Sequence, residues 1–221
     1  MRLDITSDIN RGYEAALNYP RTDKLVVFIH WFSFAVVAIL AFTNSVFKIA
    51  INYPSPFSWR VISFQEALWT LIIGLFAALL PTLLVGKFSN HYYWRLFISF
   101  TLSVFAYLAV FISGGSIEMH FMFFGMIALV AIYADWRLGW FMFVLVGLHH
   151  GILNYLAPTW VYFYGRNDFS IFAHAFPVII EVIFTTILCV IHRTTTEQVQ
   201  QIRADFQEIN KQIELEKKHN H

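Results

Sequence analysis

Residues 170–192 read SIFAHAFPVIIEVIFTTILCVIH, an apolar run that only a few polar side chains interrupt. A helix of about 20 apolar residues, rising 1.5 Å per residue, crosses the hydrocarbon core of a bilayer. The residues that follow, 193–221, read RTTTEQVQQIRADFQEINKQIELEKKHNH and are strongly polar. This abrupt change predicts a membrane-spanning helix that continues into a water-exposed helical tail.

The composition of the whole chain agrees with a membrane protein. Of its 221 residues, 58% are hydrophobic and 13% are charged, whereas a soluble domain carries about 25% charged residues. The 24 phenylalanines exceed what a soluble core of this size needs, so we expect apolar side chains to face lipid. The single cysteine, Cys189, excludes a disulfide framework and a cysteine-based zinc motif in this chain. No nucleic-acid partner is expected.

Six segments are long and apolar enough to cross the bilayer, which predicts an all-α membrane protein with six transmembrane helices. A polar segment, residues 1–24, precedes them and has no signal-peptide pattern. The six-helix domain then covers residues 25–192, and a helical tail covers residues 193–221. The predicted spans are Leu25–Ala50, Phe64–Val85, Tyr92–Ile112, Ile117–Ala134, Leu138–Ala157 and Ser170–His192.

Basic residues gather on one side of this topology. Seven lie before the first span or beside the second and fourth loops, namely Arg2, Arg11, Arg21, Lys24, Lys87, Arg95 and Arg137. The other side carries only Lys48, Arg60 and Arg166. Because Lys and Arg gather on the cytoplasmic side of membrane proteins, this asymmetry predicts that both termini lie in the cytoplasm.

The tail has the apolar repeat of a coiled coil. Its apolar residues recur at spacings of three and four, as in the a and d positions of heptads. They are Val199, Ile202, Phe206, Ile209 and Ile213. This pattern predicts a homodimer held through the tail and leading toward an output domain that follows it. The alternative is an amphipathic helix lying on the bilayer surface.

Polar side chains inside the predicted spans mark a candidate site, because they are costly in a membrane. Four histidines on the last three spans fall in the outer half of the bilayer: His120, His149, His150 and His174. At about 100° per residue, His149 and His150 diverge, so at most one points squarely into a shared site. Glu118 and Glu181 are candidate additional ligands, and Asn154 and Thr185 are candidate supports for the ligating histidines.

Imidazole suits copper, iron, zinc and haem b iron, so a transition metal or haem is the predicted cofactor. Met119, Met122 and Met126 would favour Cu(I) if they pointed inward, although their common face reads better as a packing stripe. Without a metal, the same histidines would form a pocket for a small ligand or a polar network that fixes helix packing.

A separate polar group is expected at the cytoplasmic side. His30 on the first span lies near this side, as do Asp135 and Arg137 in the fourth loop. These three residues are candidates for an inner polar lock between helices. The simpler alternative is that Asp135-Trp136-Arg137 is a hairpin with an interfacial tryptophan and a cytoplasmic arginine.

Three motifs in order resemble a known sensor family. They are SGGSIEMHF at 113–121, YADWR at 133–137 and HHGILNYL at 149–156, followed by His174-Ala175. This combination resembles the N-terminal membrane region of bacterial methyl-accepting chemotaxis proteins and hybrid sensor histidine kinases. Ala134 departs from the Arg or Lys that the family commonly has before Asp-Trp-Arg.

The resemblance implies a sensor that detects a ligand, metal or redox signal and passes it to a cytoplasmic kinase, cyclase or chemotaxis output. No enzymatic activity is expected of this chain itself. The alternative is a membrane-embedded haem or di-iron redox protein, against which the tail argues. A small transporter is disfavoured because the sequence shows no inverted repeat and no paired Gly/Pro-interrupted helices.

Overall fold

The structure is a computed structural model that describes residues 19–48, 60–89 and 91–219. These residues form helices and turns, with no strand among them. The N-terminal segment 1–18 and the predicted end of the first span at Ala50 lie outside the described residues. The helices are α2 (Tyr19–Val46), α3 (Phe64–Phe88), α4 (Tyr92–Ile112), α5 (Ile117–Val130), η1 (Ala131–Tyr133), α6 (Trp136–Leu156), η2 (Pro158–Trp160) and α7 (Asp168–His219).

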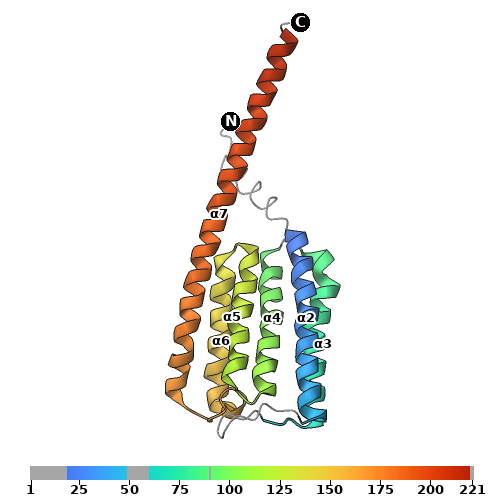
Figure 1. Ribbon diagram of the computed structural model, residues 1–221, viewed down its shortest axis with the longest axis vertical. Helices are drawn as coiled ribbons and strands as arrows, with labels where there is room; N and C mark the ends of the chain where they lie inside the picture. The colour runs from blue at the N-terminus through green and yellow to red at the C-terminus, as the bar shows by residue number, and fades with distance from the viewer. Residues whose placement is uncertain (1–18, 49–59, 90, 220–221) are drawn as a thin grey trace.

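Successive long helices run in alternating directions, and α7 extends far beyond the others (Figure 1). The start of α2 and the projecting part of α7 lie at the same end of the bundle, called here the tail end (Figure 1). The opposite end, called the loop end, contains the 113–116 turn and the segment between α6 and α7. Because the six helices α2 to α7 alternate in direction, α7 ends at the same end of the bundle at which α2 begins.

Five helices are long and apolar enough to cross a membrane: α2, α3, α4, α6 and α7. The predicted fourth span, Ile117–Ala134, is different, because α5 and η1 together form a shorter apolar helix, Ile117–Tyr133. It ends where Ala134 adopts a left-handed backbone with a φ of 51°. At 1.5 Å per residue this helix is about 26 Å long, slightly less than a typical hydrocarbon core. Five spans are therefore supported, and the sixth stays a prediction.

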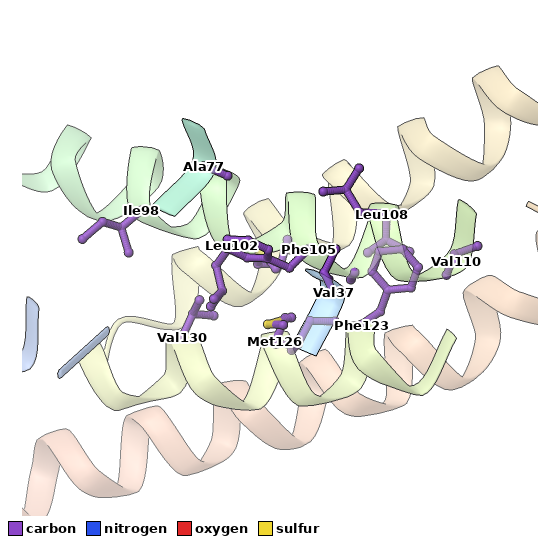
Figure 2. Packing of buried hydrophobic residues seen from close by; sticks show 14 of the residues in the cluster. Val37, Ala77, Ile98, Leu102, Phe105, Leu108, Val110, Phe123, Met126 and Val130 are labelled. Carbon is purple, nitrogen blue, oxygen red and sulfur yellow. The ribbon is translucent and has the colours of Figure 1, made fainter. Parts of the chain in front are cut away.

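The core is organised around α4. Its apolar stretch is two-thirds buried, against one-third or less for the other four candidate spans. Figure 2 shows its side chains packed among residues of α2, α3 and α5, including Val37, Ala77 and Phe123. Met126 is buried in this cluster, and Met119 and Met122 pack against it. The methionines therefore serve packing, as their common face indicates.

The outer surface of the bundle is strongly apolar. Large side chains such as Phe64, Leu83, Phe121 and Phe169 are each more than 60% exposed. A monomeric soluble protein rarely exposes so much contiguous apolar surface. These faces are the surfaces that lipid would cover.

The last helix is continuous from Asp168 to His219, a length of 52 residues. It therefore joins the apolar segment and the polar tail without a break, as the sequence predicts. The tail residues Val199, Ile202, Phe206, Ile209 and Ile213 are 42–65% exposed. The helix is confirmed, whereas its pairing with a second copy stays a prediction.

Candidate functional site

Three histidines from three helices meet at the loop end. His120 lies in the first turn of α5, His150 in the second half of α6 and His174 near the start of α7. The ring centroids are 5.3 Å apart for His120 and His150, and 5.0 Å apart for His120 and His174. The third pair, His150 and His174, is separated by 5.5 Å. The histidine cluster, defined as these three residues, is thus compact.

Each ring of the histidine cluster is tied to its own helix in the same way. The Nδ1 atoms of His120, His150 and His174 lie 2.7, 2.9 and 2.8 Å from the carbonyl oxygen four residues earlier. A carbonyl oxygen can only accept, so Nδ1 carries the proton and donates. The lone pair of the neutral ring then lies on Nε2. The Nε2 atoms of His120 and His150 are buried and have no partner within the described residues.

Tyr162, in the loop between α6 and α7, covers the histidine cluster. Its ring centroid lies 5.1 Å from that of His174, 5.8 Å from that of His150 and 6.4 Å from that of His120. The residue is completely buried, and burial raises the pKa of its phenol. Its hydroxyl group has no hydrogen-bond partner among the described residues. Tyr162 therefore adds a neutral oxygen beside the three imidazoles.

Two features hold this loop in place. Gly115 adopts a φ of 81°, and a Cβ atom there would lie 2.5 Å from the backbone nitrogen of Tyr162. The loop thus approaches the 113–116 turn as closely as glycine permits. At its other end, the Asn154 side chain donates to Asp168 and accepts from the backbone N–H of Asn167. Asn154 therefore positions the loop, and no contact of its side chain with the histidine rings is recorded.

His149 differs from the other three histidines. Its ring stacks on Tyr107, with centroids 4.4 Å apart and an interplanar angle of 11°. Its centroid is 5.2 Å from that of His150. Within the described residues, its Nε2 is buried without a partner, and no Nδ1 bond to the preceding turn is recorded. His149 therefore lies beside the histidine cluster and faces α4.

The remaining predicted site residues do not join the histidine cluster. Glu118 is exposed on α5 and Glu181 is half-buried on α7, and within the described residues neither joins the histidines in a group that could hold a metal. Thr185 is buried where α7 passes Gly139 of α6, so it contributes to helix packing. The potential metal ligands in and beside the histidine cluster are therefore imidazoles and one phenol.

The ring spacing matches a three-histidine metal centre. Three imidazoles bound through Nε2 at about 2.0–2.1 Å in a tetrahedral arrangement have centroids about 5 Å apart. In the present ring orientations, no group of three His, Cys, Asp or Glu side chains in the described part of the chain is arranged to hold a metal. A bound metal would therefore require the rings to turn from these orientations about the terminal torsion, which is broad in histidine. The spacing, not the present orientation, is the observation that favours a metal.

The same spacing disfavours haem. Where two histidines ligate haem iron, they approach from opposite faces of the porphyrin, so the macrocycle must stand between the two rings. Every pair in the histidine cluster has centroids within 5.5 Å. Tyr162 occupies the space next to them. The spacing of the cluster as packed therefore does not support a haem held between two of its histidines.

The three residues predicted to form an inner polar lock, His30, Asp135 and Arg137, do not form one group. Asp135 pairs with Arg137 and Arg95, whereas His30 makes separate contacts. Asp135 accepts from the Arg137 guanidinium at 2.8 Å from each carboxylate oxygen, and lies 3.9 Å from buried Arg95. His30 instead contacts the Val26 carbonyl and the Thr101 hydroxyl, at 2.7 and 2.9 Å.

Two hydrogen bonds of Asp23, which the sequence does not predict, connect α2 to the tail end of the bundle. The completely buried Asp23 accepts from Tyr133 at 2.8 Å and from Ser89 at 2.5 Å. These contacts join α2, the end of α3 and η1 at the tail end of the bundle. The tail end therefore has a polar network alongside the Asp135 ion pairs.

Comparison with protein-family models, curated proteins and solved structures found no match. The resemblance of the 113–158 region to bacterial sensor modules therefore stays a prediction. The function has to be inferred from the geometry of the site.

Proposed function

We propose that the chain is the membrane sensor module of a bacterial signalling receptor, and that its histidine cluster binds a transition-metal ion. The observation that carries the proposal is the spacing of three imidazoles from three helices, whose centroids lie 5.0–5.5 Å apart. The hydrogen bonds of Nδ1 leave Nε2 as the metal ligand and fix the tautomer, as the outer hydrogen bonds of metal-binding histidines usually do. Burial of unpartnered nitrogens is costly, and a metal would remove that cost.

The donor set favours a monovalent ion. Imidazole ligands and a phenol hydroxyl supply no negative charge, and within the described residues Glu118 and Glu181 do not join the histidines in a group that could hold a metal. The cost of moving an ion into a medium of low dielectric constant grows with the square of its charge. Imidazole suits copper as well as zinc and iron. Copper in its Cu(I) state is therefore the preferred occupant, ahead of Zn²⁺ and Fe²⁺.

Metal binding should depend on pH, because a protonated imidazole cannot ligate. Free imidazole side chains take up a proton near pH ~6.5, so protons compete with the metal below that value. We expect occupancy to be high at about pH 7.5 and to fall toward pH ~5.5. Metal retained after gel filtration at each pH measures this, with helix content by circular dichroism as the control for folding. Equal retention at both pH values would contradict ligation by histidine.

The orientation follows from the placement of the basic residues on the fold. Arg21 and Lys24 lie at the tail end, together with the α3–α4 and α5–α6 connections that carry Lys87 and Arg137. The positive-inside rule favours a cytoplasmic tail end and a histidine cluster in the outer half of the membrane, which for a bacterial receptor is the inner membrane. This placement requires the short α5–η1 helix to complete a sixth crossing.

Single-cysteine labelling tests this orientation. Thr159→Cys in the α6–α7 loop and Gln198→Cys in the tail are exposed positions, after Cys189 has been replaced. A membrane-impermeant maleimide should label Thr159→Cys in intact spheroplasts, and Gln198→Cys only after lysis. The reverse pattern would put the histidine cluster on the cytoplasmic side and contradict the orientation.

Signal output is assigned to α7. This helix carries His174 at the site and the exposed apolar seam from Val199 to Ile213 in the tail. A continuous helix can transmit a rotation or a small translation from one to the other. Pairing of two tails as a parallel coiled coil would bury the seam. The kinase, cyclase or chemotaxis domain implied by the resemblance would receive the movement.

Cross-linking tests the dimer. Cysteines at Ile202, Phe206 and Ile209 should form disulfides between copies in oxidised membranes, because these seam positions would face each other. Cysteines at Arg203 and Asp205 should cross-link several-fold more slowly, because they lie beside the seam. Similar rates at all five positions, or no cross-linking, would favour a tail that lies on the bilayer surface.

A further inference from the structure

Glu181 is a carboxyl group within the apolar part of α7. At 1.5 Å per residue it lies about 20 Å along the helix from Asp168, and therefore within a hydrocarbon core of about 30 Å. Its side chain is half-buried and forms no hydrogen bond or ion pair with another described residue. An ionisable side chain at this depth normally pairs with another polar group. The described part of the chain leaves this carboxyl group without such a partner.

Glu181 also shares its heptad position with the apolar seam of the tail. In the proposed coiled coil, Ile202 and Ile209 occupy d positions. Counting back from Ile202 in heptad steps reaches Thr195, Leu188 and Glu181. Residues spaced by heptads drift by only about 20° per heptad in a straight helix, and supercoiling of a paired helix removes this drift. The heptad line, defined as these five residues, therefore joins the membrane-spanning part of α7 to the seam of the tail.

The heptad line is open on the surface of the bundle. Where α7 packs on α5 and α6, its buried side chains centre roughly 90° away from Leu188; they are Val178, Val182, Thr185 and Cys189. In contrast, Leu188 and its neighbours Phe184 and Ile191 are 55–62% exposed. No other helix within the described residues therefore covers this face, and in a single chain only lipid would.

We propose that a second copy of the chain covers this face, and that Glu181 pairs there with Glu181 of the partner subunit. The proposal rests on the parallel dimer of the proposed function and extends that dimer from the tail into the membrane. In a parallel twofold dimer, equivalent residues of the seam face each other at the same depth. Two carboxyl groups that share a proton can hydrogen-bond, because one donates and the other accepts. Lipid acyl chains offer no such partner.

Disulfide cross-linking within the membrane tests this interface. Leu188→Cys and Val190→Cys form a matched pair, made after Cys189 has been replaced. The two positions are 62% and 48% exposed and lie at nearly the same depth, but they point about 160° apart. In oxidised membranes that contain the full chain, Leu188→Cys should form linked dimers several-fold faster than Val190→Cys. Equal rates, or a faster rate at Val190→Cys, would overturn the proposed face.

Cross-linking in the tail separates this inference from the dimer itself. Ile202→Cys that cross-links while Leu188→Cys does not exceed Val190→Cys would leave the tail dimer standing and overturn only its continuation into the membrane. Absence of cross-linking at both Ile202→Cys and Leu188→Cys would overturn the dimer and this inference together.

Two variants test the part played by Glu181. Glu181→Leu removes the polar group, so the dissociation constant of the dimer should rise about threefold to twentyfold, the usual worth of a hydrogen bond between membrane helices. Glu181→Gln keeps a group that both donates and accepts, so its dissociation constant should stay within about twofold of the wild-type value. Energy transfer between copies labelled at Gln198→Cys, followed as the lipid-to-protein ratio rises, measures dissociation. Circular dichroism is the control for folding.

The outcomes also separate the Glu181 pair from the proposed metal site. An unchanged or tighter dimer in Glu181→Leu would overturn the pairing. Metal content should stay at the wild-type level in both variants, because Glu181 lies outside the histidine cluster. Loss of metal in Glu181→Leu with an unchanged dimer would overturn the inference by placing Glu181 at the metal. Absence of metal from the wild-type protein would leave the dimer measurements valid.

Discussion

Replacing His150 or His174 with alanine is expected to remove nearly all bound metal while leaving the helices folded. Each substitution removes one of the three proposed imidazole ligands, and loss of a direct ligand weakens a metal site more than loss of a group that only supports a ligand. We expect the affinity to fall at least about 100-fold, more than the 10- to 100-fold that follows loss of an outer supporting group. Metal content by mass spectrometry after gel filtration measures the loss.

The matched control is His192→Ala. This histidine lies on the same helix as His174 and is exposed beyond the buried part of α7. It should retain metal at the wild-type level. His30→Gln should also retain metal, because His30 contacts Thr101 and no cluster ring. Metal content that stays normal in both His150→Ala and His174→Ala would contradict the assigned ligands.

Gly115→Ala should disturb the loop that covers the site. The new methyl group would lie 2.5 Å from the Tyr162 backbone nitrogen and 2.6 Å from the Val161 carbonyl oxygen, at a φ of 81°. A left-handed backbone costs a residue with a Cβ atom about 1–2 kcal/mol, and the backbone clash adds to this. We expect a lower midpoint of thermal unfolding and a metal affinity reduced through displacement of Tyr162.

Gly125→Ala is the control for this substitution. Gly125 lies within α5, and a Cβ atom there would meet nothing within 4 Å. Alanine favours a helix interior over glycine by about 0.5–1 kcal/mol, so this variant should unfold at the same temperature or slightly higher. A Gly115→Ala protein that matches Gly125→Ala in both stability and metal affinity would show that the loop does not depend on this contact.

Much of the fold can be predicted from the sequence, because a helix that crosses a lipid bilayer must be apolar over about 20 residues. Length and hydropathy locate the helices, and the 3.6-residue period separates His149 from His150. The structure places His150 among the cluster rings and His149 against Tyr107. The short α5 was harder to foresee, since its end depends on the left-handed backbone of Ala134. Alanine has no sequence signal for that conformation.

Tyr162 and the buried position of Arg95 could not be predicted from the sequence, because both depend on contacts between residues far apart in the chain. Tyr162 lies in a loop whose sequence predicts only a connection, and it reaches the histidines because the loop folds back onto Gly115. The Gly114-Gly115 pair before α5 is the one local feature of the sequence that indicates a close approach of another segment. From the sequence, Arg95 is expected only to add positive charge on the cytoplasmic side. In the structure it is buried near Asp135.

The sequence predicts Glu181 as an additional ligand, but the structure does not place it in the histidine cluster. It lies on nearly the same line of α7 as His174, Thr185 and His192. Burial changes along that line, from half-buried His174 to buried Thr185 and exposed His192, as α7 leaves the bundle. Angular position alone therefore cannot show which members of a stripe meet the other helices.

The metal content of the wild-type protein, purified without chelators, tests the central claim most directly. Elemental analysis should find about one transition-metal ion per chain, with copper the preferred metal. X-ray absorption at the metal edge should show about three nitrogen ligands near 2.0 Å. Protein that contains no stoichiometric metal, and takes up neither Cu(I) nor Zn²⁺ when these are supplied, would contradict the account.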